Sequence, residues 1–149
     1  MIVMKFGGTS VESATAIARV ATIVQARVDR RPVVVVSAMG KTTNRLLAMA
    51  HAAAEGQQGE AMRQLEELKE YHRIEASQIV REEDKAELAA LLEEHFGELA
   101  QMVAEIAEVE EFSPRMVDAV SSMGERLSSR IVTLGFRYAG MDAVHVDSR

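Results

Sequence analysis

The segment PVVVV at residues 32–36 constrains the fold more than any other part of the chain. Its four consecutive valines favour an extended strand, because branching at Cβ restricts χ1 and suits a pleated sheet. An apolar run without alternation is typical of a central strand that is covered on both faces in a parallel sheet. Residues Ile2 to Phe6 predict a second strand of this kind, apolar apart from Lys5.

A helix is predicted after each of these strands. The first begins at about Ser13, a favourable N-cap, and the second runs from the loop at residues 37–44 to about Glu55. The apolar stripe of the first helix consists of Ile17, Val20, Val24 and Val28.

The rest of the chain is predicted to be mainly helical. Residues 60–111 are rich in Glu, Ala, Leu and Met, and their apolar residues recur at helical spacing, which predicts a long helical hairpin. A further helix is predicted from Pro114 to about Tyr138, with Ser113 as its N-cap. Gly140 ends it, and DAVHV at residues 142–146 predicts a third strand.

This order of elements predicts an α/β fold with a largely parallel sheet. Ligands of such folds bind at the carboxyl ends of the strands. Three segments occupy those places, namely Lys5–Ser10, Ser37–Asn44 and Asp147–Arg149.

Composition excludes several classes of function. The 149 residues carry a formal net charge of −6, whereas nucleic-acid binding needs a clustered basic face. There is no cysteine, and the four histidines have no metal-ligand spacing, so no protein-held metal is predicted. No apolar run approaches the roughly 20 residues that span a bilayer, and the first residues lack a secretory signal pattern. We expect a cytoplasmic protein that binds neither nucleic acid nor membrane.

The segment KFGGTS, Lys5 to Ser10, lies between a predicted strand and a predicted helix. Glycines let backbone N–H groups approach phosphate oxygens, and a helix N-terminus just beyond favours negative charge. Lys5 adds a mobile positive charge, while Thr9 and Ser10 add hydroxyl donors. A phosphate site and an ordinary tight turn are both compatible with this pattern.

The loop SAMGKTTN at residues 37–44 contains GKTT, which is part of a P-loop motif. That motif needs another glycine five residues before Gly40, and Val35 stands there, so a P-loop is excluded. The hydroxyls of Ser37, Thr42 and Thr43 could orient a small polar substrate. Thr42 or Thr43 could instead cap the next helix, and this interpretation is slightly favoured for Thr42.

In the long helix, Ser121, Glu125 and Ser129 fall on one face, opposite Leu127. Small hydroxyls around a single carboxylate are unusual on an exposed helix face, so Glu125 is a candidate for binding an ammonium group. A simple exposed polar face is the alternative. Gly124 costs about 1 kcal/mol relative to alanine in a helix, which indicates a close approach at this position.

Three segments in this order resemble aspartate kinase, a member of the amino-acid kinase superfamily. They are KFGGTS, VVVVSAMGKTTN and MGERLSS. The resemblance extends over the whole chain. Acetylglutamate and uridylate kinases share the lysine and the glycine pair, but the Thr-Ser extension and the GERLS helix are similar to aspartate kinase. The resemblance implies a three-layer α/β/α sandwich, of which residues 1–149 form the amino-terminal half with a hairpin insertion at 60–111.

The resemblance also implies ATP-dependent phosphorylation of the side-chain carboxylate of L-aspartate to 4-phospho-L-aspartate, at the start of lysine, threonine and methionine synthesis. Lys5 would be catalytic by stabilising charge on the transferring phosphoryl group. The implied phosphate-binding residues are Lys5, Phe6, Gly7, Gly8 and Ser10. The implied aspartate-binding residues are Thr9, Ser37, Thr43 and Glu125, with Glu125 pairing with the substrate ammonium. Mg²⁺ would arrive bound to the ATP phosphates.

Aspartate kinases are longer than this chain, so the resemblance places the nucleotide half and the regulatory domains outside it. We therefore expect little or no kinase activity from residues 1–149 alone, and we expect self-association into a homo-oligomer. Two other functions stay open. One is a kinase of the same superfamily with another carboxylate or carbamate acceptor, and the other is a non-catalytic interaction module built on the 60–111 hairpin.

Overall fold

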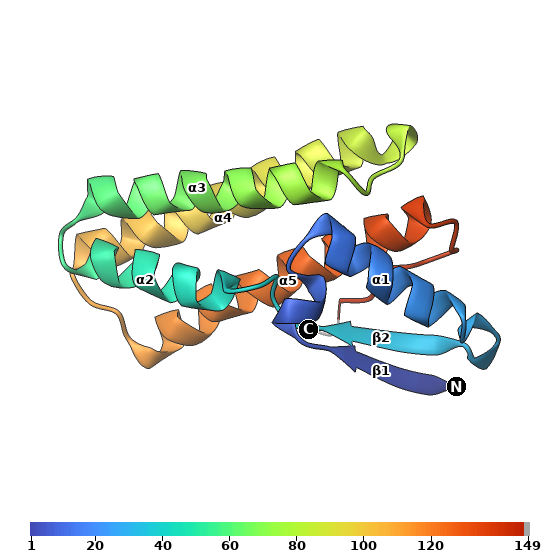
Figure 1. The fold of residues 1–149 in the computed structure, drawn as a ribbon. Coiled ribbons are helices and arrows are strands. Elements are labelled where there is room, and N and C mark those ends of the chain that lie inside the picture. The colour runs from blue at the N-terminus through green and yellow to red at the C-terminus, as the bar shows by residue number, and fades with distance from the viewer. Residues whose placement is uncertain (148–149) are drawn as a thin grey trace.

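The structure is a computed structural model that describes residues 1–147, and Figure 1 shows a small sheet beside a bundle of long helices. Short 3-10 turns, labelled η, join some of the elements. In chain order the elements are β1 (Ile2–Phe6), η1 (Gly8–Val11), α1 (Ala14–Gln25), η2 (Val28–Arg30), β2 (Pro32–Val36), α2 (Thr42–Ala54), α3 (Gln58–Ser77), η3 (Glu82–Asp84), α4 (Lys85–Val109) and α5 (Pro114–Tyr138).

The sheet consists of β1 and β2, which pair in parallel, with Ile2 opposite Pro32 and Phe6 opposite Val36. The predicted α/β class and parallel pairing are confirmed. The inward face packs on the helical core through Met4, Phe6, Val34 and Val36. On the other face Val33 and Val35 are 48% and 45% exposed, so the predicted burial of both strand faces is not observed in the described residues.

The predicted third strand at residues 142–146 is wrong, because this segment has no strand conformation. Its polar groups bond to α5 instead of to a neighbouring strand. The Arg137 Nε donates to the Ala143 carbonyl at 3.0 Å, and the Ser129 hydroxyl lies 3.0 Å from the His145 ring. A β-strand forms backbone hydrogen bonds to a neighbouring strand, whereas the bonds of this segment to α5 are made by the Arg137 and Ser129 side chains.

The predicted start of α1 and the predicted start and end of α5 are confirmed. Ser13 caps α1 by accepting from the Ala16 N–H, and Ser113 caps α5, which starts at Pro114 and ends at Tyr138. The apolar stripe of α1 is shorter than predicted. The helix ends at Gln25, and Val28 is 51% exposed in η2.

The predicted hairpin is confirmed as α3 and α4, which pack against each other and against α2. Figure 1 shows α5 running from this bundle to the sheet, where it contacts α1 and β2. The helix α5 therefore connects the two parts of the molecule. None of the described helices combines the length and the apolar character needed to cross a membrane.

Two histidines lie in the core of the bundle. The His72 side chain is fully buried, with Nδ1 at 2.8 Å from the Leu68 carbonyl and Nε2 at 3.4 Å from the Thr42 hydroxyl. A carbonyl can only accept, so Nδ1 carries the proton and Nε2 accepts from Thr42. Burial lowers the pKa of His72 to about 4, and burial together with Arg126 lowers the pKa of His95 to about 4. Both rings are neutral in the folded chain near pH 7.

The free energy of unfolding should fall as the pH drops from about 6.5 to about 4. In the unfolded chain each histidine takes up a proton near its ordinary pKa of about 6.5, whereas the folded chain holds both rings neutral down to about 4. The unfolded state thus binds more protons in this window, and each ring contributes a slope of up to about 1.4 kcal/mol per pH unit. Urea unfolding at pH 7.5, 6 and 5 measures this slope.

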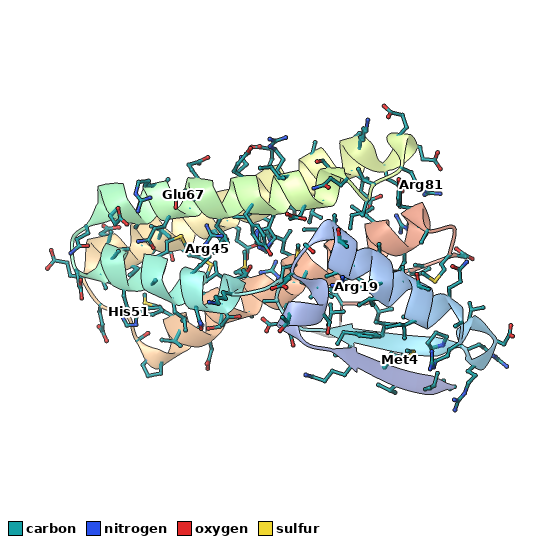
Figure 2. All side chains as sticks on the ribbon, in the orientation of Figure 1. Met4, Arg19, Arg45, His51, Glu67 and Arg81 are labelled. Carbon is teal, nitrogen blue, oxygen red and sulfur yellow. The ribbon has the colours of Figure 1, made fainter. Side chains whose placement is uncertain are left out.

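The variant His72→Gln should reduce the slope, because it removes one of the two titrating groups. The matched control is His51→Gln, since His51 lies exposed on α2 (Figure 2). An equal slope in His72→Gln and in the unmodified chain would contradict the assignment of this acid sensitivity to His72.

Gly124 allows α5 to pack closely on the loop after β2. A Cβ on Gly124 would lie 2.7 Å from the Ala38 Cβ, which cannot move without its backbone. Gly124→Ala should therefore destabilise the chain by about 1–2 kcal/mol, since overpacking outweighs the gain in helix propensity. Gly97→Ala on α4 is the control. No atom lies within 4 Å of its new Cβ, so this variant should be stabilised by up to about 1 kcal/mol. Thermal unfolding that ranks the two variants the other way would refute the close approach.

Candidate functional site

The first segment of the candidate site is loop 1, residues 7–13, between β1 and α1. Gly7 is extended, with φ −77° and ψ 173°, and η1 follows at once. A Cβ on Gly8 would lie 2.8 Å from the carbonyl oxygens of Ala38 and Gly40, whereas a Cβ on Gly7 would meet nothing within 4 Å. The two glycines therefore differ. Gly8 is required by contact with a neighbouring loop, while Gly7 faces open space.

The second segment is loop 2, residues 37–41, between β2 and α2. It lies against loop 1 through backbone hydrogen bonds. The Ser37 N–H donates to the Phe6 carbonyl and the Gly40 N–H donates to the Gly8 carbonyl, each at 3.0 Å. Parallel pairing of β1 and β2 carries the two strand ends to the same edge, and these bonds continue that pairing into the loops.

The helix α1 does not offer its N-terminus to a ligand in the way the sequence pattern predicted. It begins only at Ala14, after η1, and the Ala14 N–H donates to the Glu75 carboxylate of α3 at 2.7 Å. Glu75 thus occupies the place where an anion would bind at this helix end.

The predicted cap at Thr42 is wrong. The N-cap position of α2 is Lys41, and no side chain bonds to the first turn. Thr42 is buried and directs its hydroxyl to His72, because this side of α2 packs on α3. Thr43 is half-buried and Lys41 is exposed, so these two neighbours remain at the rim of loop 2.

The third segment is the middle of α5, which docks on loop 2. The Ser128 hydroxyl is buried and donates to the Ser37 carbonyl at 2.8 Å, one turn after Gly124. The sequence pattern did not indicate a role for Ser128. Its spacing of four residues from Gly124 nevertheless places both residues on one side of the helix. This contact orients the backbone of Ser37, one of the predicted substrate-binding residues.

Glu125 follows Gly124 directly and is exposed, as are Lys5, Thr9 and Ser10. Of the two hydroxyls that share its face, Ser121 is half-buried and Ser129 contacts His145 at 3.0 Å. The pKa of His145 is lowered by partial burial and by Arg130, against the opposing effect of Asp147. The structure thus brings the β1 end, loop 2 and the Glu125 turn of α5 into one region.

Phe6 contributes its backbone to this region and its side chain to the core. Its carbonyl accepts a hydrogen bond from the Ser37 N–H, and its side chain packs on the apolar core. The predicted place at Asp147–Arg149 falls largely outside the described residues, because 148 and 149 lie beyond them. Within residues 1–147, no three His, Asp or Glu side chains converge in a way that could hold a metal ion.

The hairpin contributes residues that the sequence pattern did not indicate. Tyr71 and Glu75 on α3 contact loop 1 and the start of α1 across about 60 positions of sequence. Their only local signal is a single tyrosine in a glutamate-rich helix, which does not indicate a site.

The sequence model of the amino acid kinase family matches residues 1–149. Aspartokinase 2, chloroplastic, of Arabidopsis thaliana is 35% identical over 98% of this chain and 26% of its own length. Aspartokinase of Candida albicans is 29% identical over 98% of this chain and 28% of its own length. The chain therefore spans about a quarter of the length of these relatives.

Solved structures agree with this similarity. Escherichia coli aspartokinase III in complex with aspartate and ADP, in the R-state, superposes with a TM-score of 0.74 at 26% identity, over 95% of this chain and 30% of that one. The same enzyme with lysine and aspartate, in the T-state, gives a TM-score of 0.73 at 27% identity. The resemblance to aspartate kinase is confirmed, and the chain belongs to the amino acid kinase family.

Proposed function

We propose that residues 1–149 supply the aspartate-binding and phosphoryl-binding part of an ATP-dependent aspartate kinase. The observation that carries this proposal is the meeting of loop 1, loop 2 and the Glu125 turn of α5 at the carboxyl ends of two parallel strands. The similarity to aspartokinases, one of which was solved with aspartate and ADP, supports the choice of substrates.

In this proposal Lys5 and the loop 1 amides act on the phosphoryl group. Phosphoryl transfer needs mainly positioning and charge neutralisation, so no nucleophilic side chain is required. Lys5 is an exposed cation one residue before the end of β1, and Gly7 leaves open space beside the loop for a phosphate. Phe6, Gly8 and Ser10 complete the loop that would hold the phosphate.

Aspartate is assigned to the side of the site formed by loop 2 and α5. Ser37 and Thr43 would hold the substrate carboxylates from one side, with Thr9 from loop 1. Glu125 would pair with the substrate ammonium, because it is an exposed carboxylate next to the helix turn that contacts loop 2. The buried Ser128–Ser37 bond preorganises this side before a substrate binds.

ATP would bring Mg²⁺ on its phosphates as part of the substrate, where the ion would neutralise charge that develops during transfer. The chain's own task is then to hold the phosphates at loop 1 and to exclude unproductive orientations. With aspartate as the acceptor, the proposed reaction lies at the start of lysine, threonine and methionine synthesis. Homo-oligomer formation stays part of the proposal, as does a cytoplasmic location, although the plant relatives are named as chloroplastic.

Among other functions, a kinase with a different carboxylate or carbamate acceptor uses the same loop 1 and differs only at the acceptor side. Within residues 1–147 the apolar stripes of α3 and α4 are buried by α2, α5 and each other, which does not favour the non-catalytic interaction module. The acceptor is therefore the point to test.

Thermal unfolding of the purified chain should shift upward when millimolar L-aspartate is added. A ligand that binds only the folded chain at ten times its Kd adds about 1.4 kcal/mol, which corresponds to a Tm increase of roughly 3–6 °C for this length. Succinate lacks the ammonium group and should give a smaller shift. L-glutamate, tested alongside, reports on the alternative acceptor class.

Glu125→Gln should weaken aspartate binding and remove most of the difference between aspartate and succinate, because it removes the charge that pairs with the ammonium. Glu105→Gln, at an exposed position on α4, is the matched control and should behave as the unmodified chain. The role of Glu125 would be refuted by an unchanged preference for aspartate in Glu125→Gln. A chain that shows no shift with aspartate but a shift with glutamate would support the alternative acceptor.

The 149-residue chain alone should release little or no ADP from ATP in the presence of aspartate, since the resemblance places the adenine and ribose contacts elsewhere. A coupled ADP assay at high protein concentration measures this. Lys5→Ala is the control, because any turnover by this site must fall when the Lys5 cation is removed. Robust aspartate-dependent turnover that is lost in Lys5→Ala would overturn the expectation of inactivity while supporting the site.

A further inference from the structure

The second half of α3 contacts both loops of the candidate site. The Tyr71 hydroxyl donates to the Glu12 carbonyl of loop 1 at 2.5 Å. The same oxygen lies beside Gly40 of loop 2, at 3.2 Å from where a Cβ on that residue would be. The Tyr71 oxygen therefore bonds to loop 1 and lies next to Gly40 of loop 2.

One turn along α3, Glu75 contacts the first residue of α1, directly after loop 1. Its carboxylate accepts from the Ala14 N–H at 2.7 Å, beside the Ser13 cap, which accepts from the Ala16 N–H at 3.1 Å. Two of the unpaired N–H groups at the start of α1 are thus satisfied, one locally and one from the hairpin. This hydrogen bond fixes the start of α1 relative to α3, and loop 1 ends at the same point.

Neighbouring side chains hold the Tyr71 ring in place. The Arg45 guanidinium of α2 lies 5.7 Å from the ring centroid, and the His72 ring meets it edge-on at 4.9 Å. Figure 2 shows Arg45 between α2 and α3. Burial and the nearby Glu75 and Glu12 raise the pKa of Tyr71, so its hydroxyl keeps the proton that it donates.

We propose that Tyr71 and Glu75 are positioning residues, which make the helical hairpin set the separation of loop 1 and loop 2 in the candidate site. This inference rests on the proposed function for its effect on aspartate. The loops themselves are joined by few bonds, of which the Gly40–Gly8 backbone bond at 3.0 Å is the central one. Gly40 has φ +53°, a left-handed conformation, and the Tyr71 oxygen lies on the side where a Cβ would project.

The first measurement is amide hydrogen exchange in the ligand-free chain, comparing Tyr71→Phe with Tyr138→Phe. Tyr138 is the other tyrosine of the chain, it ends α5, and it is 55% exposed. Tyr71→Phe removes only the bridging hydroxyl. The Gly40 and Ser10 amides should then exchange about 3–10-fold faster, the size expected for one lost hydrogen bond, while core amides of α4 stay unchanged. Equal loop exchange in the two variants would overturn the proposal.

A second pair of variants tests Glu75. Glu75→Ala should speed exchange of the Ala14 amide, and Glu75→Gln, which keeps an acceptor oxygen, should restore part of the protection. Glu66→Ala, at an exposed position on α3, is the control. Loss of protection throughout α1 and α3 in Glu75→Ala, with no rescue by Glu75→Gln, would show a general structural role and would overturn the positioning role.

The second measurement is aspartate affinity, taken from thermal shifts at several concentrations. Tyr71→Phe should weaken binding about 3–10-fold, and Tyr138→Phe should not. Faster loop exchange with unchanged affinity would overturn the link to the site. If the unmodified chain shows no aspartate shift, the proposed function fails, and the exchange experiment alone decides whether the hairpin positions the loops.

Discussion

The candidate site depends on one backbone contact, the approach of Gly8 to Ala38 and Gly40. A single Cβ at Gly8 would come within 2.8 Å of two carbonyl oxygens, so the two loops can meet only because that atom is absent. Parallel pairing brings the strand ends together, and the Gly40–Gly8 bond holds the loops there. Every other part of the site is arranged around this junction.

Two helical elements support the junction from different sides. The helix α5 packs on loop 2 through Gly124 and bonds to Ser37 through Ser128, while α3 contacts loop 1 and Gly40 through Tyr71. Because α5 also contacts α1, β2 and the bundle, the small sheet is not an independent unit. The long hairpin therefore contributes to the geometry of the loops as well as to the core.

Much of the fold could be predicted because its signals are local. The valine run, the Ser13 and Ser113 caps, and the bounds of α5 follow from rotamers, capping and helical periodicity over a few residues. The predictions that failed depend on side-chain contacts between elements, which the local pattern of each segment does not show. Thr42 bonds to His72 of α3 instead of capping α2, and residues 142–146 bond to α5 instead of to a strand.

The sequence by itself determined the class of fold, the order of elements from β1 to α5, and the family resemblance through KFGGTS, VVVVSAMGKTTN and MGERLSS. Local chemistry suffices for these, since strand, turn and helix propensities act over short distances. Only the tertiary structure decided which glycine is required for contact, that Glu75 occupies the start of α1, and that Tyr71 bridges the loops. The glycine contact joins two loops about 30 residues apart, and the contacts of Tyr71 and Glu75 join α3 to residues about 60 positions away, so no local pattern encodes them.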